Sequence, residues 1–260
     1  MATPQTVLDL NRAAWERYKD GRWSTPVSPE QIAAARRGEW EEYLIESTPV
    51  PRDWFPALRG ADVLALATGG GQQGPILAAA GAKVIVLDAS PAQLARDRLV
   101  AERDHLALET VHGDMTDLSR FADERFDLVF HPVANHFVPD VRPVWREAFR
   151  VLKPGGVLLA GFLNPMEYIF DWAKEDAGLL EVARTLPFAS LDMYGEAWLR
   201  AHGEAAEYSH SLEAQIGGQL AVGFRLTHLL ESHRAPGTSP KAGRFPSYIA
   251  TRAVKPPRAV

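Results

Sequence analysis

The chain has 260 residues, 46% of them hydrophobic, and a formal net charge of −5. These values suit a compact α/β domain with a substantial core and provide no basic face for nucleic acid. The sequence contains no cysteine, which excludes disulfides, zinc–thiolate sites and cysteine nucleophiles. Residues 1–20 carry no signal-peptide pattern, and no apolar run reaches the length of a membrane span, so we expect a cytoplasmic protein.

Two helices are expected near the N-terminus. Apolar spacing from Leu8 to Tyr18 indicates the first, and Ser28 followed by Pro29 begins a second that we expect to extend to Tyr43. A proline-rich linker follows. We therefore interpret residues 1–56 as an N-terminal helical lid segment and residues 57–260 as the main domain.

Apolar runs alternate with helix-like segments from Asp62 onward. Strands are expected near 62–67, 83–88, 108–112, 126–131 and 156–162, with helices near 74–80, 90–103 and 140–152. This alternation predicts a mostly parallel sheet with helices on both faces. A helix near 210–221 and strands near 223–230 and 248–254 fit an antiparallel hairpin at the end of the sheet. Residues 166–208 lack a regular pattern and are interpreted as a lid insertion.

Three consecutive glycines, Gly69 to Gly71, end the first expected strand. Glycine backbone takes positive φ and lets a ligand approach the free N–H groups of the helix that follows. Asp88 ends the second expected strand, a position that suits an acid gripping a ribose diol. Together the turn and the acid predict a nucleoside-containing cofactor.

Further motifs follow in order along the chain: His112-Gly113-Asp114-Met115, then Phe126 to His131, and then Leu152-Lys153-Pro154-Gly155-Gly156. With them, the chain from about Asp62 to Val254 resembles the class I S-adenosylmethionine-dependent methyltransferases. The resemblance implies a seven-stranded, mostly parallel Rossmann-like sheet with an antiparallel last strand. It also implies that S-adenosyl-L-methionine is the cofactor and S-adenosyl-L-homocysteine the product.

The resemblance implies which residues contact this cofactor. They are Ala67, Gly69, Gly71, Gln73, Asp88, Ala89, Gln93, Gly113, Asp114 and Met115. Asp88 matches the family's ribose acid, and Asp114 with Met115 matches its adenine-binding pair. In the N-terminal loop, Trp23 and Ser24 are expected to cover the sulfonium end.

Two histidines follow the fourth expected strand. His131 ends that strand, at the edge where open α/β sheets bind ligands, and we expect it to line the cofactor pocket. His136 follows in the same loop and is a candidate base or acceptor contact. Both are candidate catalytic residues, and no metal site is expected.

Methyl transfer from a sulfonium is a direct displacement, so the protein needs no covalent nucleophile and mainly aligns the reactants. Aromatic residues of the lid, with Phe162 and Trp172, favour a small organic acceptor over a protein or nucleic acid, and no membrane partner is expected. Two alternatives stay open. Ala65 stands where the family often has an acid, which favours a non-catalytic S-adenosylmethionine-binding or regulatory protein. An NAD-dependent oxidoreductase is disfavoured because no Tyr-x-x-x-Lys pair is present.

Overall fold

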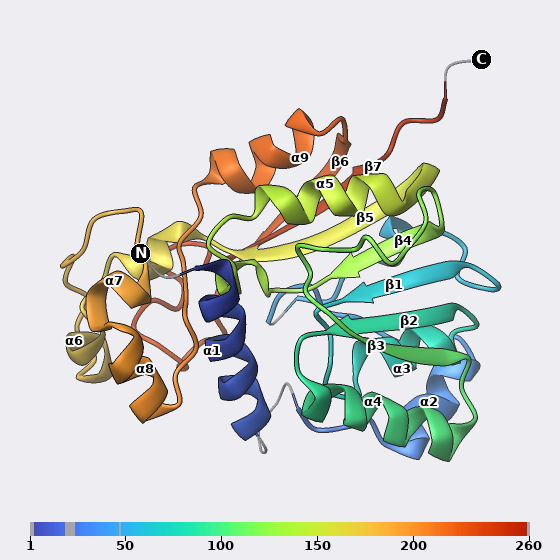
Figure 1. Cartoon of the computed structure of the whole chain (residues 1–260), viewed down its shortest axis with the longest axis horizontal. Helices are drawn as coiled ribbons and strands as arrows, with labels where there is room; N and C mark the ends of the chain where they lie inside the picture. The colour runs from blue at the N-terminus through green and yellow to red at the C-terminus, as the bar shows by residue number, and fades with distance from the viewer. Residues whose placement is uncertain (1–2, 19–23, 47, 259–260) are drawn as a thin grey trace.

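The computed structural model describes residues 3–18, 24–46 and 48–258. Across these residues the strands form a seven-stranded sheet of order β3-β2-β1-β4-β5-β7-β6 (Figure 1). The strands are β1 Asp62–Leu66, β2 Lys83–Asp88, β3 Leu108–His112, β4 Phe126–His131, β5 Leu152–Leu163, β6 Arg225–Ser232 and β7 Tyr248–Val254. β1 to β5 pair in parallel, whereas β7 runs antiparallel to both β5 and β6. This arrangement confirms the expected fold class.

The helices largely alternate with the strands. The described α-helices are α1 Pro4–Arg17, α2 Pro29–Arg36, α3 Gln73–Ala79, α4 Pro91–Asp104, α5 Arg142–Val151, α6 Trp172–Asp176, α7 Ser190–Tyr194, α8 Glu196–His202 and α9 Gly218–Ala221. Short helical turns are η1 Arg52–Trp54, η2 Asn135–Phe137, η3 Pro165–Tyr168 and the π-helical turn η4 Glu213–Gly217. Among the described residues, no helix is both long and apolar enough to span a bilayer.

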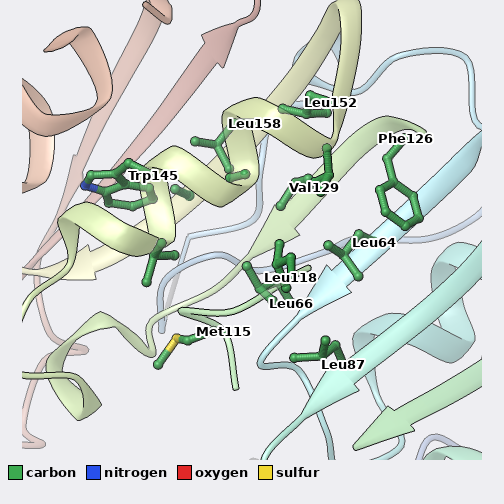
Figure 2. Close-up of a cluster of buried hydrophobic side chains, with 14 of the residues drawn as sticks. Leu64, Leu66, Leu87, Met115, Leu118, Phe126, Val129, Trp145, Leu152 and Leu158 are labelled. Atoms are coloured by element: carbon green, nitrogen blue, oxygen red, sulfur yellow. The ribbon is translucent and has the colours of Figure 1, made fainter. Parts of the chain in front are cut away.

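The central strands β1, β4 and β5 are buried on both faces of the sheet, and their alternating side chains point into two separate cores. On one face, Leu64 and Leu66 of β1 pack in a cluster with Trp145 of α5. Figure 2 shows these two leucines between Leu87 of β2 and Val129 of β4. Fully burying one such side chain stabilises the fold by about 1.5–3 kcal/mol, so this double-sided core fixes the strand ends at which a ligand would bind.

The opposite face of β1 carries Val63 and Ala65, which pack against Leu77 of α3 and Leu94 of α4. Outside this layer, α2 packs on α3 and α4. The described part of residues 1–56 therefore does not form one unit. α2 packs on this face of the sheet, whereas α1 packs against α8.

α2 ends at Arg36, seven residues before the expected end at Tyr43. Gly38 takes a φ of +87°, the N–H of Gly38 donates to Ala35 O, and the N–H of Glu39 donates to Ala34 O. This pair of bonds is a Schellman cap, which stops a helix where a glycine adopts the left-handed conformation. The expected extension to Tyr43 was wrong because this glycine was not recognised as a C-cap.

β5 begins at Leu152, whereas the sequence predicted a turn over Lys153 to Gly156 before the strand. The Gly155 N–H donates to Lys255 O, and the Lys255 N–H donates to Gly156 O. Chain beyond β7 therefore pairs with both glycines, while Gly155 takes a φ of +84°, so the expected turn is present as a bulge within β5. The register shift between Phe126 and Leu128 marks the same irregularity on the β4 side.

α1 and the lid insertion lie together. Val7 and Leu10 of α1 pack against Leu199 of α8 and Ala206 in a small separate cluster. Figure 1 shows α6, α7 and α8 grouped at one end of the molecule, with α1 beside them and with β1 and β4 pointing toward it. The carboxyl edge of the sheet therefore faces these helices. How the chain divides into domains stays a prediction.

Candidate functional site

A cavity of about 440 Å³ opens at the carboxyl edge of the parallel strands, where open α/β sheets bind ligands. The sheet wall of this cavity consists of lining residues at 67–69, 72–73, 87–90, 93 and 113–115. The lid wall consists of lining residues at 8, 11–12, 15, 43–46, 132–134, 136–138, 163, 207, 234 and 248. The two walls come largely from different parts of the chain.

The glycine turn of the sheet wall has a tightly specified backbone. Ala67, Gly70 and Gly71 take positive φ values of 54°, 134° and 76°. A Cβ added at Gly69 would lie 2.7 Å from Gln93 Cβ and 2.9 Å from Asp88 Oδ2. Only glycine fits this contact without displacing a neighbour, so the turn is locked against β2 and α4.

Asp88 braces the same turn from the tip of β2. Its Oδ2 accepts the Gly69 N–H at 2.9 Å, and its Oδ1 accepts the Ser90 N–H at 2.9 Å. Burial raises the pKa of this carboxyl, and the backbone N–H donors oppose that rise. Each carboxylate oxygen keeps further lone pairs, and Asp88 lines the cavity. A vicinal diol that donates hydrogen bonds fits this position.

Asp97 of α4 is a second carboxylate at the turn, and the sequence analysis missed it. It is 0% exposed, and its Oδ2 accepts the Gly70 N–H at 3.0 Å. Burial is the main cause that raises its pKa to about 7, and the nearby Asp88 adds to the rise. The four-residue spacing from Gln93 places both polar side chains on one helix face, which was the available signal. Two buried carboxylates thus hold the glycines from two elements.

Gln93 connects α4 to the end of α1. Its Nε2 donates to Trp15 O at 3.1 Å and to Tyr18 O at 3.3 Å, while Ser24 Oγ donates to its Oε1 at 3.0 Å. Gln93 lines the cavity, but Ser24 is not among its lining residues and is buried in this network. The expected partner Trp23 lies outside the described residues.

The third-strand motif also reaches the sheet wall. Gly113, Asp114 and Met115 line the cavity, as do Ala67, Gly69, Gln73 and Ala89. Asp114 Oδ1 accepts the Thr116 N–H at 2.9 Å, and Met115 also belongs to the core cluster in Figure 2. The structure therefore brings these predicted residues together around one cavity, and their contacts with the cofactor stay predictions.

Gly71 lies apart from the cavity. A Cβ there would meet Arg96 O at 3.0 Å and Pro26 Cβ at 3.1 Å, and its carbonyl accepts the Val27 N–H at 2.9 Å. The residue faces the chain that enters α2 rather than the space at the strand ends. Gly71 therefore allows the backbone of the turn to approach the chain before α2 closely, and it does not line the cavity.

His131 also lies behind the cavity wall rather than in it. The ring is fully buried, with Nδ1 2.9 Å from Leu66 O and Nε2 2.6 Å from Asn135 Oδ1. Asn135 in turn donates to Gln215 Oε1 at 2.9 Å. Strand alternation points His131 toward Trp145 of α5. Burial lowers the pKa of the ring, its two hydrogen bonds oppose that shift, and the ring anchors the loop after β4.

His136 is the loop histidine that does line the cavity. Its Nδ1 is buried and has no hydrogen-bond partner among the described residues. Burial, reinforced by His210, lowers its pKa to about 3. The imidazole is therefore neutral at physiological pH and is a weak base, so it suits a hydrogen-bond contact to a ligand better than proton abstraction.

Asn11 of α1 ties the lid wall together. Its Nδ2 donates to Phe137 O at 2.6 Å, and its Oδ1 accepts the Ala206 N–H at 2.6 Å. One amide thus joins α1, the loop after β4 and the lid insertion. A buried polar residue directly after Leu10 on the apolar face of α1 was the sequence signal.

A family model described as a methyltransferase domain matches residues 64–160. The "Uncharacterized methyltransferase YbaJ" of Bacillus subtilis is 46% identical over 250 residues, covering 94% of this chain and 97% of that protein.

Solved structures are similar at lower identity. An S-adenosylmethionine-dependent methyltransferase from Mesorhizobium loti has a TM-score of 0.61 and 20% identity, covering 78% of this chain and 94% of that one. A putative S-adenosylmethionine-dependent methyltransferase from Listeria monocytogenes has a TM-score of 0.59 and 19% identity, covering 86% and 99%. These two likenesses support the fold, whereas the similarity to the Bacillus protein extends over nearly the whole of both chains. The chain therefore belongs to the methyltransferase family, with the fold of these two S-adenosylmethionine-dependent enzymes.

Proposed function

We propose that this methyltransferase transfers the methyl group of S-adenosylmethionine to a small organic acceptor. The observation that carries the proposal is that one cavity of about 440 Å³ is lined by both Asp88 of the sheet wall and the residues of the lid wall. This volume lies within the usual range of small-molecule sites. The net charge of −5 gives no support to a nucleic-acid acceptor.

The sheet wall fits an adenosyl group. Asp88 has lone pairs for the ribose hydroxyls, while Asp114 and Met115 would hold the adenine. Gly69 presents only backbone to the cavity, because a Cβ at this position would collide with Gln93 and Asp88. When bound, the cofactor supplies a methyl group that its sulfonium already activates.

The remaining task of the protein is positioning and exclusion of water. We assign the exclusion of water to α1 and the lid insertion, because Asn11 ties both to the loop after β4. His136, neutral and on the cavity surface, would contact the acceptor. Residues of the glycine turn and Asp88 would set the position of the donor.

Calorimetric titration with S-adenosylmethionine tests the donor half of the site. Asp88→Asn should weaken binding by about 10- to 100-fold, because a hydrogen bond to a charged group contributes about 1.5–3 kcal/mol. Asp117→Asn is the matched control, since Asp117 also accepts a backbone N–H two residues later, from Ser119, but is exposed. Unchanged affinity in Asp88→Asn would remove Asp88 from the site.

Transfer of labelled methyl groups to a panel of phenols, amines and thiols tests the acceptor half. We expect turnover with at least one member of the panel. Tight binding of S-adenosylmethionine without transfer to any acceptor would instead favour a binding or regulatory protein.

A further inference from the structure

The lid wall contains a carboxylate that lacks a cationic partner among the described residues. Glu207 lines the cavity, and its Oε2 accepts the Tyr168 hydroxyl at 3.0 Å. By contrast, the Arg234 guanidinium on the same wall lies 2.7 Å from Glu167 Oε2. Glu207 is only partly exposed, and a carboxylate that is partly removed from water without a compensating charge is a candidate functional group. Glu207 is therefore a site candidate that no sequence motif indicated.

Hydrogen bonds hold the backbone around Glu207 on three sides. Its N–H donates to Ser190 Oγ at 2.8 Å, and its carbonyl accepts the Ser190 N–H at 2.9 Å. The preceding Ala206 N–H is held by Asn11, and the following Tyr208 N–H donates to His136 O at 2.8 Å. The carboxylate is thus positioned beside the cavity before any ligand arrives, which reduces the reorganisation cost of catalysis.

These bonds connect Glu207 to the lid wall and not to the glycine turn. Its neighbours are α1, α7 and the loop that carries His136. The glycine turn is instead held by Asp88 and Asp97. Because Glu207 is bonded to the lid wall and not to the glycine turn, we place it in the half of the cavity that would hold the acceptor, and not in the half that would hold the methyl donor.

The surroundings of Glu207 also favour proton acceptance. Burial raises the pKa of its carboxyl, while the Tyr168 hydroxyl opposes that rise by donating to the ionised form. A carboxylate of raised pKa is a better general base at neutral pH than an exposed one. Its wall neighbour His136 has a pKa of about 3 and is the weaker base.

We propose that Glu207 binds the methyl acceptor and takes the proton of its hydroxyl or amino nucleophile, an inference that rests on the proposed function. The nucleophile forms a bond to the methyl carbon as the carbon–sulfur bond breaks, and the electron pair of that bond goes to sulfur. The proton of the nucleophile goes to the Glu207 carboxylate, so a sulfonium and a protic acceptor become a thioether and a methylated product.

The first test compares wild type with Glu207→Gln, which keeps the shape of the side chain but cannot take the proton. The probes are a series of substituted phenols of similar size, with thiols as acceptors that ionise unaided. Glu207→Gln should lower kcat for weakly acidic phenols by at least about 100-fold, much less for acidic phenols and thiols, and should leave the Kd for S-adenosylmethionine within about twofold. Glu196→Gln, an exposed change on α8 of the lid insertion, is the matched control and should match wild type, because it loses only an exposed ion pair with Arg200.

The second test uses the pH–rate profile with a weakly acidic phenol. Activity requires ionised Glu207 and so falls as pH drops through the pKa of that carboxyl. Tyr168→Phe removes the hydroxyl that donates to the ionised form of Glu207. The acidic limb of the profile should therefore move to higher pH by about one unit, because one hydrogen bond contributes about as much free energy as a shift of one pKa unit. A purely structural role of Glu207 would not move this limb.

Three results would overturn the inference: wild-type rates in Glu207→Gln with weakly acidic phenols, transfer by wild type to thiols alone, or a loss of S-adenosylmethionine affinity in Glu207→Gln. The last result would assign Glu207 to the cofactor's amino group instead. Failure of wild type to bind S-adenosylmethionine is a different outcome, which would overturn the proposed function as well.

Discussion

The sheet wall and the lid wall of the cavity are built in different ways. The sheet wall comes from three successive strand ends, between Ala67 and Met115, and its buried carboxylates accept backbone N–H groups. The lid wall combines segments from Leu8 to Tyr248, and its charges pair with other side chains. Substitutions in the sheet wall disturb hydrogen bonds to the backbone of the glycine turn, so few are tolerated. In the lid wall, a single side chain can be replaced without moving the backbone of the other segments.

A buried charge network lies behind the lid wall. Lys241, with 4% of its side chain exposed, lies 3.3 Å from Glu167 Oε2 and 2.7 Å from Glu175 Oε2. These pairs fasten the β6–β7 connection to the lid insertion. Removing one member of a buried pair leaves an uncompensated charge, so this network constrains how far the lid wall can vary around Glu207.

The largest expected effect comes from Gly69→Ala in the sheet wall. Its new Cβ would lie 2.7 Å from Gln93 Cβ and 2.9 Å from Asp88 Oδ2, so both side chains must move. Saturable binding of S-adenosylmethionine should disappear in calorimetry. Gly217→Ala is the control, because its Cβ would make an ordinary contact of 3.6 Å with Glu213 Cγ. Wild-type affinity in Gly69→Ala would show that the turn is not as closely packed as described.

A smaller effect is expected from Asn11→Ala in the lid wall. The change leaves Phe137 O and the Ala206 N–H without their partner, at a cost of about 2–4 kcal/mol of unfolding free energy. Methyl transfer should fall more than S-adenosylmethionine affinity, because the loosened segments carry His136 and Glu207. Gln5→Ala, an exposed change on the same helix, is the control. Equal losses of affinity and turnover would contradict the division into two walls.

The smallest expected effect is a pH dependence caused by Asp97. Its folded pKa of about 7 lies above the ordinary value of 3.8, so the native state keeps a proton that the unfolded chain loses. The unfolding free energy that this group contributes therefore falls as pH rises from about 4 to 7, by up to about 1.4 kcal/mol per pH unit. Asp97→Asn lacks this titration, so urea unfolding should show it gaining about 1–2 kcal/mol relative to wild type between pH 5 and 7. A constant difference between the two proteins would contradict the buried, ionisable state of Asp97.

The sheet wall could be predicted because its determinants are local. The expected strands at 83–88, 108–112, 126–131 and 248–254 have those bounds in the structure. Of the residues predicted at the cavity, Asp88 and Met115 line it, whereas His131 and Ser24 are buried beside it. The face of the sheet toward which a strand-end histidine points depends on the register of the strand. The apolar pattern alone does not decide that face for His131.

The sequence by itself determined the alternating strands, the glycine turn and the acid at the end of β2, because each follows from periodicity or backbone chemistry within a few residues. Only the tertiary structure placed Asp97 under the turn, joined Asn11 to Phe137 and Ala206, and left Glu207 facing the cavity. These contacts join residues as many as 195 positions apart. Side-chain pairs at such separations leave no periodic trace, because they depend on packing between distant elements and not on the repeat within one element.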